Sequence, residues 1–253
     1  MTRAPAPTLH VLRRALATVL ATVLAPVVGA VVAMVWRRRA APRHETVGEI
    51  AAGIPGAEGR EGHEHGEDGA GIQGAERGNG PLVHRRYDIV LEGVTLVPAE
   101  LLRLVRQHLT ELAPSALADF VKSHGEDMLL AVGDEYQITM LGPWNGAVRV
   151  VEVGRQSFTL VTLDGHPEAG HITFSVRHDI VHPGACTVRV ESWARARNAL
   201  VRAAYSLGPG QQMQTEVWVT FLQRVAALVG IGTPGTVEIT TESHAHTAPL
   251  LDG

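Results

Sequence analysis

Hydrophobic and polar residues alternate along most of residues 135–193, with turn-forming residues between the alternating runs. In one run Phe158 and Leu160 alternate with hydroxyl side chains, and in the next run Ile172 and Phe174 do the same. A period of two with β-branched and aromatic residues is typical of antiparallel strands that bury one face. The pattern predicts strands over residues 84–93, 135–141, 147–153, 157–163, 171–177 and 186–193.

Apolar residues recur at intervals of three and four in other stretches, which indicates helices. Pro98 stands near the start of the first of them, where proline is well tolerated. The predicted helices cover residues 97–112, a short segment around Leu117, Phe120 and Val121 that ends near Gly125, residues 198–207 and residues 211–229. One strand, two helices, a run of antiparallel strands and a long closing helix together predict an α+β fold.

Residues 15–36 contain no charged residue and are followed directly by three arginines. Twenty-two residues at about 1.5 Å each span roughly 33 Å as a helix, enough to cross a hydrocarbon core of about 30 Å. We therefore expect a transmembrane helix after a basic tail over residues 1–14. A cleaved signal peptide with small residues at 28–30 and a buried core helix are the alternatives.

The orientation of this helix depends on the arginines that flank it. Arg3, Arg13 and Arg14 precede it, and Arg37, Arg38, Arg39 and Arg43 follow it. The positive-inside comparison is close to a tie, and we expect a single-pass membrane protein with a cytoplasmic folded domain.

Two segments have the composition of flexible chain. Residues 37–81 are rich in glycine and glutamate and hold few large apolar residues, so they cannot bury enough apolar area to offset the ordering entropy. We expect a disordered linker there, a helix-and-sheet domain over residues 82–230 and a flexible tail over residues 231–253.

His63-Glu64-His65 offers two ligands for a weak metal site without a third fixed one, and His244 and His246 receive no role.

The overall composition and the absence of known motifs argue against several classes of function. The formal net charge of −4 implies no general attraction to nucleic acid, and the single cysteine, Cys186, excludes an intramolecular disulfide. No nucleophile elbow, phosphate loop, dinucleotide fingerprint or cysteine metal motif is present. We accordingly expect no cofactor and no metal.

His166 and Glu168 form the first candidate site, in the turn G-H-P-E-A-G at residues 165–170. A histidine and a carboxylate at this spacing could act as general base and orienting group. The structural alternative is a tight connection in which Gly165 and Gly170 supply unusual backbone angles.

Further candidates lie on the strands and the last helix. Arg149 and Glu152 are three apart in one strand, so they should lie on opposite faces, with one of them pointing inward to a partner or ligand. The alternative is a salt bridge of Arg149 on the outer face of the sheet. Trp144 in a P-W-N-G turn could cover the mouth of a cavity, and Trp218 lies on the apolar stripe of the last helix. Glu191 and Trp193 share a strand face that we expect on the outside of the sheet.

Several motifs resemble a known family. They are G-D-E-Y at 133–136, G-P-W-N-G-A-V-R-V-V-E-V at 142–153, T-L-D-G-H-P-E-A-G at 162–170, V-E-S-W-A-R at 190–195 and M-Q-T-E-V-W at 213–218. On these motifs residues 84–229 resemble the domain of unknown function nineteen-ninety. The order of elements also resembles the START-like, polyketide-cyclase-like helix-grip proteins. The resemblance implies a curved antiparallel sheet closed over a long C-terminal helix, and no reaction.

A sheet that closes over a helix commonly leaves a cavity between the two, and we place function there. The leading hypothesis is a membrane-anchored domain that binds an apolar or amphipathic small molecule, with Trp144, Arg149, Glu152, His166, Glu168 and Trp218 as candidate ligand-binding residues. The alternatives are an enzyme of cyclase or hydratase type at the cavity mouth and a ligand-free, membrane-tethered interaction domain.

Overall fold

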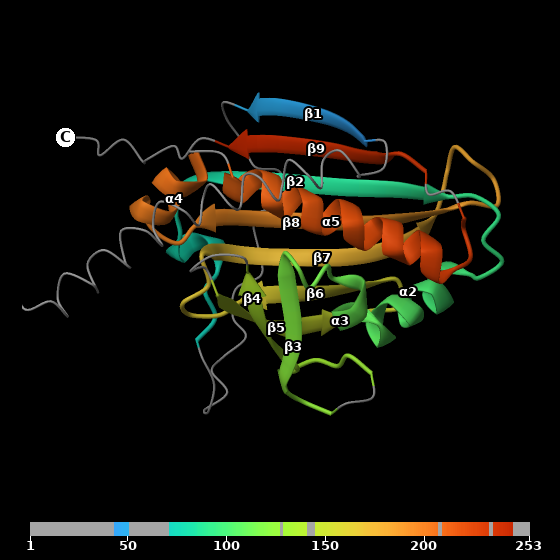
Figure 1. Ribbon diagram of the computed structural model, residues 1–253, viewed down its shortest axis with the longest axis horizontal. Helices are drawn as coiled ribbons and strands as arrows, with labels where there is room; N and C mark the ends of the chain where they lie inside the picture. Colours follow the sequence, from blue (N-terminus) through green and yellow to red (C-terminus); the bar gives the residue numbers. More distant parts are fainter. Residues whose placement is uncertain are drawn as a thin grey trace, which may run out of the picture.

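The computed structural model describes residues 43–50, 71–126, 129–140, 145–206, 209–232 and 235–244. In these residues the chain forms one large curved sheet with few helices, which confirms the predicted mixed α+β class (Figure 1). The strand order is β1-β9-β2-β8-β7-β6-β5-β4-β3. Neighbouring strands are antiparallel, except that β1 runs parallel to β9.

The elements have the following bounds. The strands are β1 (Arg43–Ile50), β2 (Asn79–Leu91), β3 (Ala118–His124), β4 (Glu135–Met140), β5 (Gly146–Val153), β6 (Ser157–Thr162), β7 (Glu168–His178), β8 (Cys186–Ala196) and β9 (Val237–His244). The helices are η1 (Ala75–Arg77), α2 (Pro98–Gln107), α3 (Leu109–Leu112), α4 (Ala199–Ser206) and α5 (Pro209–Leu228).

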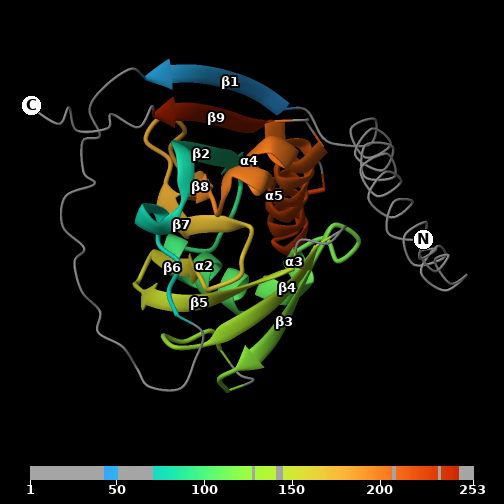
Figure 2. The ribbon, with the colours of Figure 1, turned by 90° about the vertical axis from the view of Figure 1, so that its left-hand side faces the viewer.

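The long helix α5 lies across one face of the sheet, which we call the inner face. Figure 2 shows the sheet curving around this helix, with β1 and β9 at one end and β3 and β4 at the other. Phe158 and Phe174 stack on neighbouring strands with ring centroids 4.7 Å apart, and Phe174 contacts Trp218 and Phe221 of α5. The alternation of the sequence places these large side chains on one face, and burying them against α5 forms the core.

The short helix predicted around Leu117, Phe120 and Val121 is wrong, because this segment is strand β3. Ala118 and Phe120 are buried, whereas Val121 is 54% exposed, which is the alternation of an edge strand. A short apolar run fits either period, and pairing with β4 decides the outcome by satisfying the backbone polar groups of the segment.

The linker and tail predictions are wrong for three segments. Residues 43–50 and 237–244 are strands at one end of the sheet, and residues 71–81 contain η1 and the start of β2. In β9, Val237 and Ile239 are buried between polar neighbours, a short alternation that the average composition of the tail conceals. The folded domain is therefore larger than residues 82–230 at both ends.

The predicted membrane helix over 15–36 and the basic tail over 1–14 lie outside the described residues. Within the described ranges, no helix combines the length and apolar character that crossing a membrane requires.

Candidate functional site

The G-H-P-E-A-G turn is fixed by Gln73, a residue that sequence reasoning had placed in the linker. The Gln73 amide nitrogen Nε2 donates hydrogen bonds of 2.8 Å to the carbonyl oxygens of both His166 and Glu168. Its carbonyl Oε1 accepts from the backbone N–H of Gly165 at 3.3 Å. Because one buried amide satisfies three backbone groups of the turn, Gln73 holds the loop in a single conformation.

His166 is buried inside this turn. Its Nδ1 lies 3.0 Å from both the backbone N–H and the carbonyl oxygen of Glu168, so the backbone of the turn holds the ring in place. The ring lies against the backbone of Gly146, where an added Cβ would be 2.2 Å from Cδ2. Burial lowers the pKa of His166 to about 4. These contacts favour the structural interpretation of the turn over a general base.

The buried neutral imidazole makes stability depend on pH. The imidazole of His166 is protonated near the ordinary histidine pKa of 6.5 in the unfolded chain but only near 4 in the folded chain. The stability that the neutral ring contributes is therefore complete above pH 6.5 and is lost as the pH falls towards 4. Between pH 7 and pH 5 we expect the free energy of unfolding to fall by about 2 kcal/mol through this group. His166→Gln should remove that part of the pH dependence in denaturant unfolding curves, whereas the exposed control His182→Gln should keep it. An unchanged slope in the His166 variant would contradict the assignment.

Glu168, the partner predicted for His166, points instead to the inner face and joins a network with β2 and α5. Gln214 Nε2 donates to Glu168 Oε2 at 2.8 Å, and Arg85 donates to Gln214 Oε1. Arg85 Nη1 also lies 3.6 Å from Glu168 Oε1. Burial raises the pKa of the Glu168 carboxyl, and the Arg85 guanidinium opposes that shift.

A second charged pair lies on the same face of the sheet. Arg43 Nη1 of β1 donates to Glu216 Oε1 of α5 at 2.6 Å, and the Glu216 side chain is only 1% exposed. We call Arg43, Arg85, Glu168, Gln214 and Glu216 the inner charged network. Sequence reasoning missed Arg85, although the alternation that includes Tyr87 and Ile89 places it on their face.

Trp218 is buried in the aromatic core. Its ring contacts Phe120 at 6.4 Å, Phe174 at 5.6 Å and Phe221 at 6.0 Å between centroids. These side chains pack together between α5 and the centre of the sheet. The role of Trp218 there is packing.

Arg149 and Glu152 lie on the same face, contrary to the prediction. A bulge in β5 shifts the register so that Val150 pairs with Leu160 while Glu152 pairs with Thr159. The extra residue restores Glu152 to the face of Arg149, the outer one. Arg149 donates through Nε and Nη2 to Glu135 Oε1 at 2.9 and 2.6 Å, which is the salt bridge on the outer face that we gave as the alternative.

The predicted residues do not converge on one site. Trp144 lies outside the described residues. Of the others, Glu168 and Trp218 face α5, Arg149 and Glu152 face away from it, and His166 lies in the turn at one end of the sheet.

A concave pocket of about 320 Å³ lies elsewhere, between the helix pair α2–α3 and strands β3–β4. We call it the α2–β3 pocket. Its lining residues are Arg106, Gln107, Leu109, Thr110, Phe120, Val121, Lys122, Leu130 and Tyr136. Small-molecule sites commonly have volumes of about 300–1,000 Å³, and this pocket lies at the lower end of that range. Polar and apolar side chains contribute to its lining in similar measure.

Two cations form the polar side of the α2–β3 pocket. Lys122 Nζ donates to Asp134 Oδ2 at 2.7 Å and lies 5.6 Å from the centre of the Tyr136 ring. Arg106 Nη2 donates to the Leu130 carbonyl at 2.6 Å. Burial raises the pKa of Tyr136, so its hydroxyl stays protonated at neutral pH. The pocket thus places the Arg106 guanidinium and the Lys122–Asp134 pair beside the apolar side chains of Leu109, Phe120 and Leu130.

Comparisons with known proteins agree with the resemblance drawn from the sequence motifs. Residues 101–225 match the model of a domain of unknown function, DUF1990. None of the curated proteins matches this chain.

Several solved structures are similar to it. Norcoclaurine synthase from Thalictrum flavum, in complex with dopamine and hydroxybenzaldehyde, has a TM-score of 0.40 and 14% identity over 66% of this chain and 96% of that chain. Ara h 8.0201 has a TM-score of 0.37 and 11% identity over 58% and 97%. A protein from Thermobifida fusca has a TM-score of 0.40 and 13% identity over 59% and 95%. At these values no residue of this chain takes a role from them.

Proposed function

We propose that this chain, whose residues 101–225 form a DUF1990 domain, is a binding module for an amphipathic small molecule held in the α2–β3 pocket. The observation that carries the proposal is the composition of the pocket, in which two fixed cations stand beside apolar and aromatic walls. A ligand with a flat or extended apolar body and one anionic or acceptor group matches that arrangement.

The ligand class follows from the charges at the pocket. Lys122 already has the Asp134 carboxylate as its partner, so the pair carries little net charge. Arg106 donates to a backbone carbonyl, which leaves its positive charge uncompensated by that bond. Since a guanidinium presents donors in a fixed fork, we expect the acceptor group of the ligand on the Arg106 side. The predicted acid–base pair, His166 and Glu168, does not line this pocket, which favours binding over catalysis.

A pocket-filling substitution tests the site. Val121 is exposed and lines the α2–β3 pocket, so Val121→Trp should occupy the pocket without disturbing the core. We expect the affinity of the full chain for naphthalene-2-sulfonate, a soluble anion with a flat apolar body, to fall by at least about tenfold, which is about 1.4 kcal/mol. Isothermal titration calorimetry measures this change.

The matched control is Val97→Trp, an exposed valine outside the α2–β3 pocket. It should bind the probe as the wild type does. Equal binding by wild type and Val121→Trp, or absence of binding by the wild type, would reject the pocket as the site.

We also propose that residues 15–36 anchor the domain to a membrane and leave the folded part on the cytoplasmic side. The uncharged run and the arginines after it support this proposal. Membrane fractionation of the full chain and of a form that begins at Ala40 tests it. The shorter form should move to the supernatant after high-speed centrifugation, and its recovery in the membrane pellet would contradict the anchor.

A further inference from the structure

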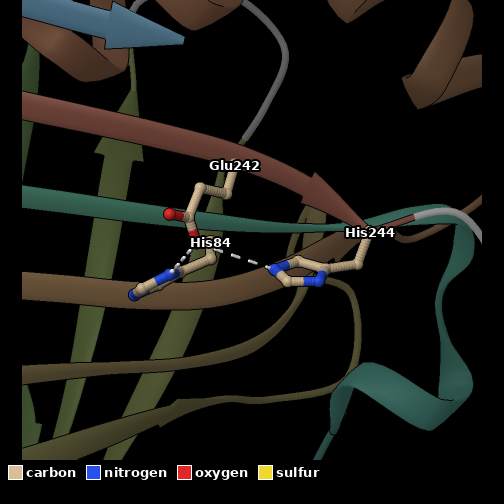
Figure 3. Close-up of side chains that lie close together, drawn as sticks. All are labelled: His84, Glu242 and His244. Atoms are coloured by element: carbon tan, nitrogen blue, oxygen red, sulfur yellow. Dashed lines mark hydrogen bonds and ion pairs between the residues drawn. The ribbon is translucent and has the colours of Figure 1, made fainter. Parts of the chain in front are cut away.

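Three potential metal ligands meet on the outer face of the sheet, away from α5 and from the α2–β3 pocket. His84 of β2 pairs directly with Glu242 of β9 in the strand register, and His244 follows two residues later on the same face. Figure 3 shows the two imidazole rings and the carboxylate directed towards one another. Strand geometry thus brings together residues that lie about 160 positions apart in the chain.

The ligand atoms of these residues all lie within 4.8 Å of one another. His84 Nδ1 is 3.2 Å from Glu242 Oε2, and His244 Nε2 is 3.9 Å from the same oxygen. With metal–ligand distances of about 2.0–2.2 Å, a tetrahedral ion separates its ligand atoms by about 3.3–3.6 Å. Side-chain adjustments of about 1 Å or less would therefore complete the coordination sphere.

His244 provides an independent indication of a ligand. Its side chain is 7% exposed, and neither ring nitrogen has a hydrogen-bond partner within the part of the chain that the structure describes. A buried imidazole without a partner costs free energy, and such groups are rare in native proteins. A cation between His244 and Glu242 would satisfy it.

Hydrogen bonds among these side chains without a metal ion account for fewer of their positions. An imidazolium at His84 could donate to Glu242 on one side and to Glu191 on the other, since its Nε2 lies 2.7 Å from Glu191 Oε1. That arrangement leaves both ring nitrogens of His244 without a hydrogen bond among the described residues. A metal ion accounts for all three side chains, with His84 Nδ1 as the ligand and Nε2–H donating to Glu191.

We propose that His84, Glu242 and His244 bind one divalent transition-metal ion of the zinc class. Two imidazoles and one carboxylate suit such an ion, whereas calcium and magnesium prefer oxygen ligands throughout. Glu191 and Trp193 hold His84 in place: the carboxylate lies 2.7 Å from Nε2 and fixes the orientation of the ring, and the indole stacks on that ring at 3.8 Å. A fourth coordination position remains for water or another ligand.

The position of the site gives the ion a structural effect. It joins β2 to the last residues of β9, the strand that also pairs with β1. Metal binding therefore secures the end of the sheet that is built from the segments outside residues 82–230.

The experiment titrates the purified full chain with Zn²⁺ against a chromogenic chelator and records the visible absorption of the Co²⁺ form. We expect one tight equivalent and the intense Co²⁺ bands of a four-coordinate site. His244→Ala and Glu242→Gln should each weaken the tight equivalent by at least about tenfold, and Glu191→Gln by about 10–100-fold. Glu242→Gln keeps the shape of a partly exposed side chain, so it tests the site even where His244→Ala fails to fold.

Two controls separate this site from other histidines. His44 forms an exposed pair with Glu238 at 3.1 Å, and His44→Ala should bind Zn²⁺ as the wild type does. The double variant His63→Ala/His65→Ala should also keep the tight equivalent. The proposal is overturned if the wild type has no tight equivalent, if Glu242→Gln binds as tightly as the wild type, or if the linker variant abolishes binding.

Discussion

Arg43→Ala should lower the free energy of unfolding by about 3–5 kcal/mol, because it leaves the carboxylate of Glu216 buried without its cation. The Glu216 side chain is 1% exposed, and Arg43 supplies a hydrogen bond of 2.6 Å. Denaturant unfolding of the full chain, followed by circular dichroism, measures the loss. The effect is large for a residue that composition alone assigns to a disordered linker.

Two further variants distinguish the ion pair from a general effect on β1. Val47→Ala, at a position that is 74% exposed in the same strand, should change stability by less than about 0.5 kcal/mol. Arg43→Met/Glu216→Met removes both charges together and should recover much of the loss, since a buried pair contributes far less than its broken form costs. A loss below about 1 kcal/mol in Arg43→Ala would show that β1 does not dock through this pair.

Gly170→Ala should destabilise the fold by about 3 kcal/mol, at the upper end of what overpacking usually costs. An added Cβ would lie 2.0 Å from the carbonyl oxygen of Trp193 and 2.7 Å from the Cα of Ala194. Both atoms belong to the backbone of β8, so the two central strands would have to separate. The thermal unfolding midpoint of the variant measures the effect.

Gly165→Ala is the matched control in the same turn. Gly165 has a φ of +96°, and an added Cβ there would have nothing within 4 Å. Only the left-handed backbone penalty of about 1–2 kcal/mol should apply. Equal losses in the two variants would mean that β7 and β8 do not approach as closely as the structure places them.

The candidate site could be predicted from the sequence only in part. The alternation around residues 157–177 placed Phe158 and Phe174 on one face, and the unusual backbone angle predicted at Gly165 is confirmed by its φ of +96°. Gly170 lies instead in β7, where the missing Cβ lets β8 approach. The inner charged network was missed because Arg43 lies in a segment whose average composition indicates disorder. Likewise, His244 received no role because His84, which lies near it in the sheet, stands at the other end of the domain sequence.

Local periodicity determined which residues of this protein alternate between buried and exposed positions, since a period of two is a property of each strand by itself. Local periodicity does not determine which strands pair, because backbone hydrogen bonds join segments that no local pattern relates. Tertiary structure alone made a strand of Ala118–His124, placed β1 and β9 at the end of the sheet and inserted the bulge that returns Glu152 to the face of Arg149. For the same reason only the fold placed His84, Glu242 and His244 within reach of one ion: the register between β2 and β9 sets their distance, and neither strand encodes that register by itself.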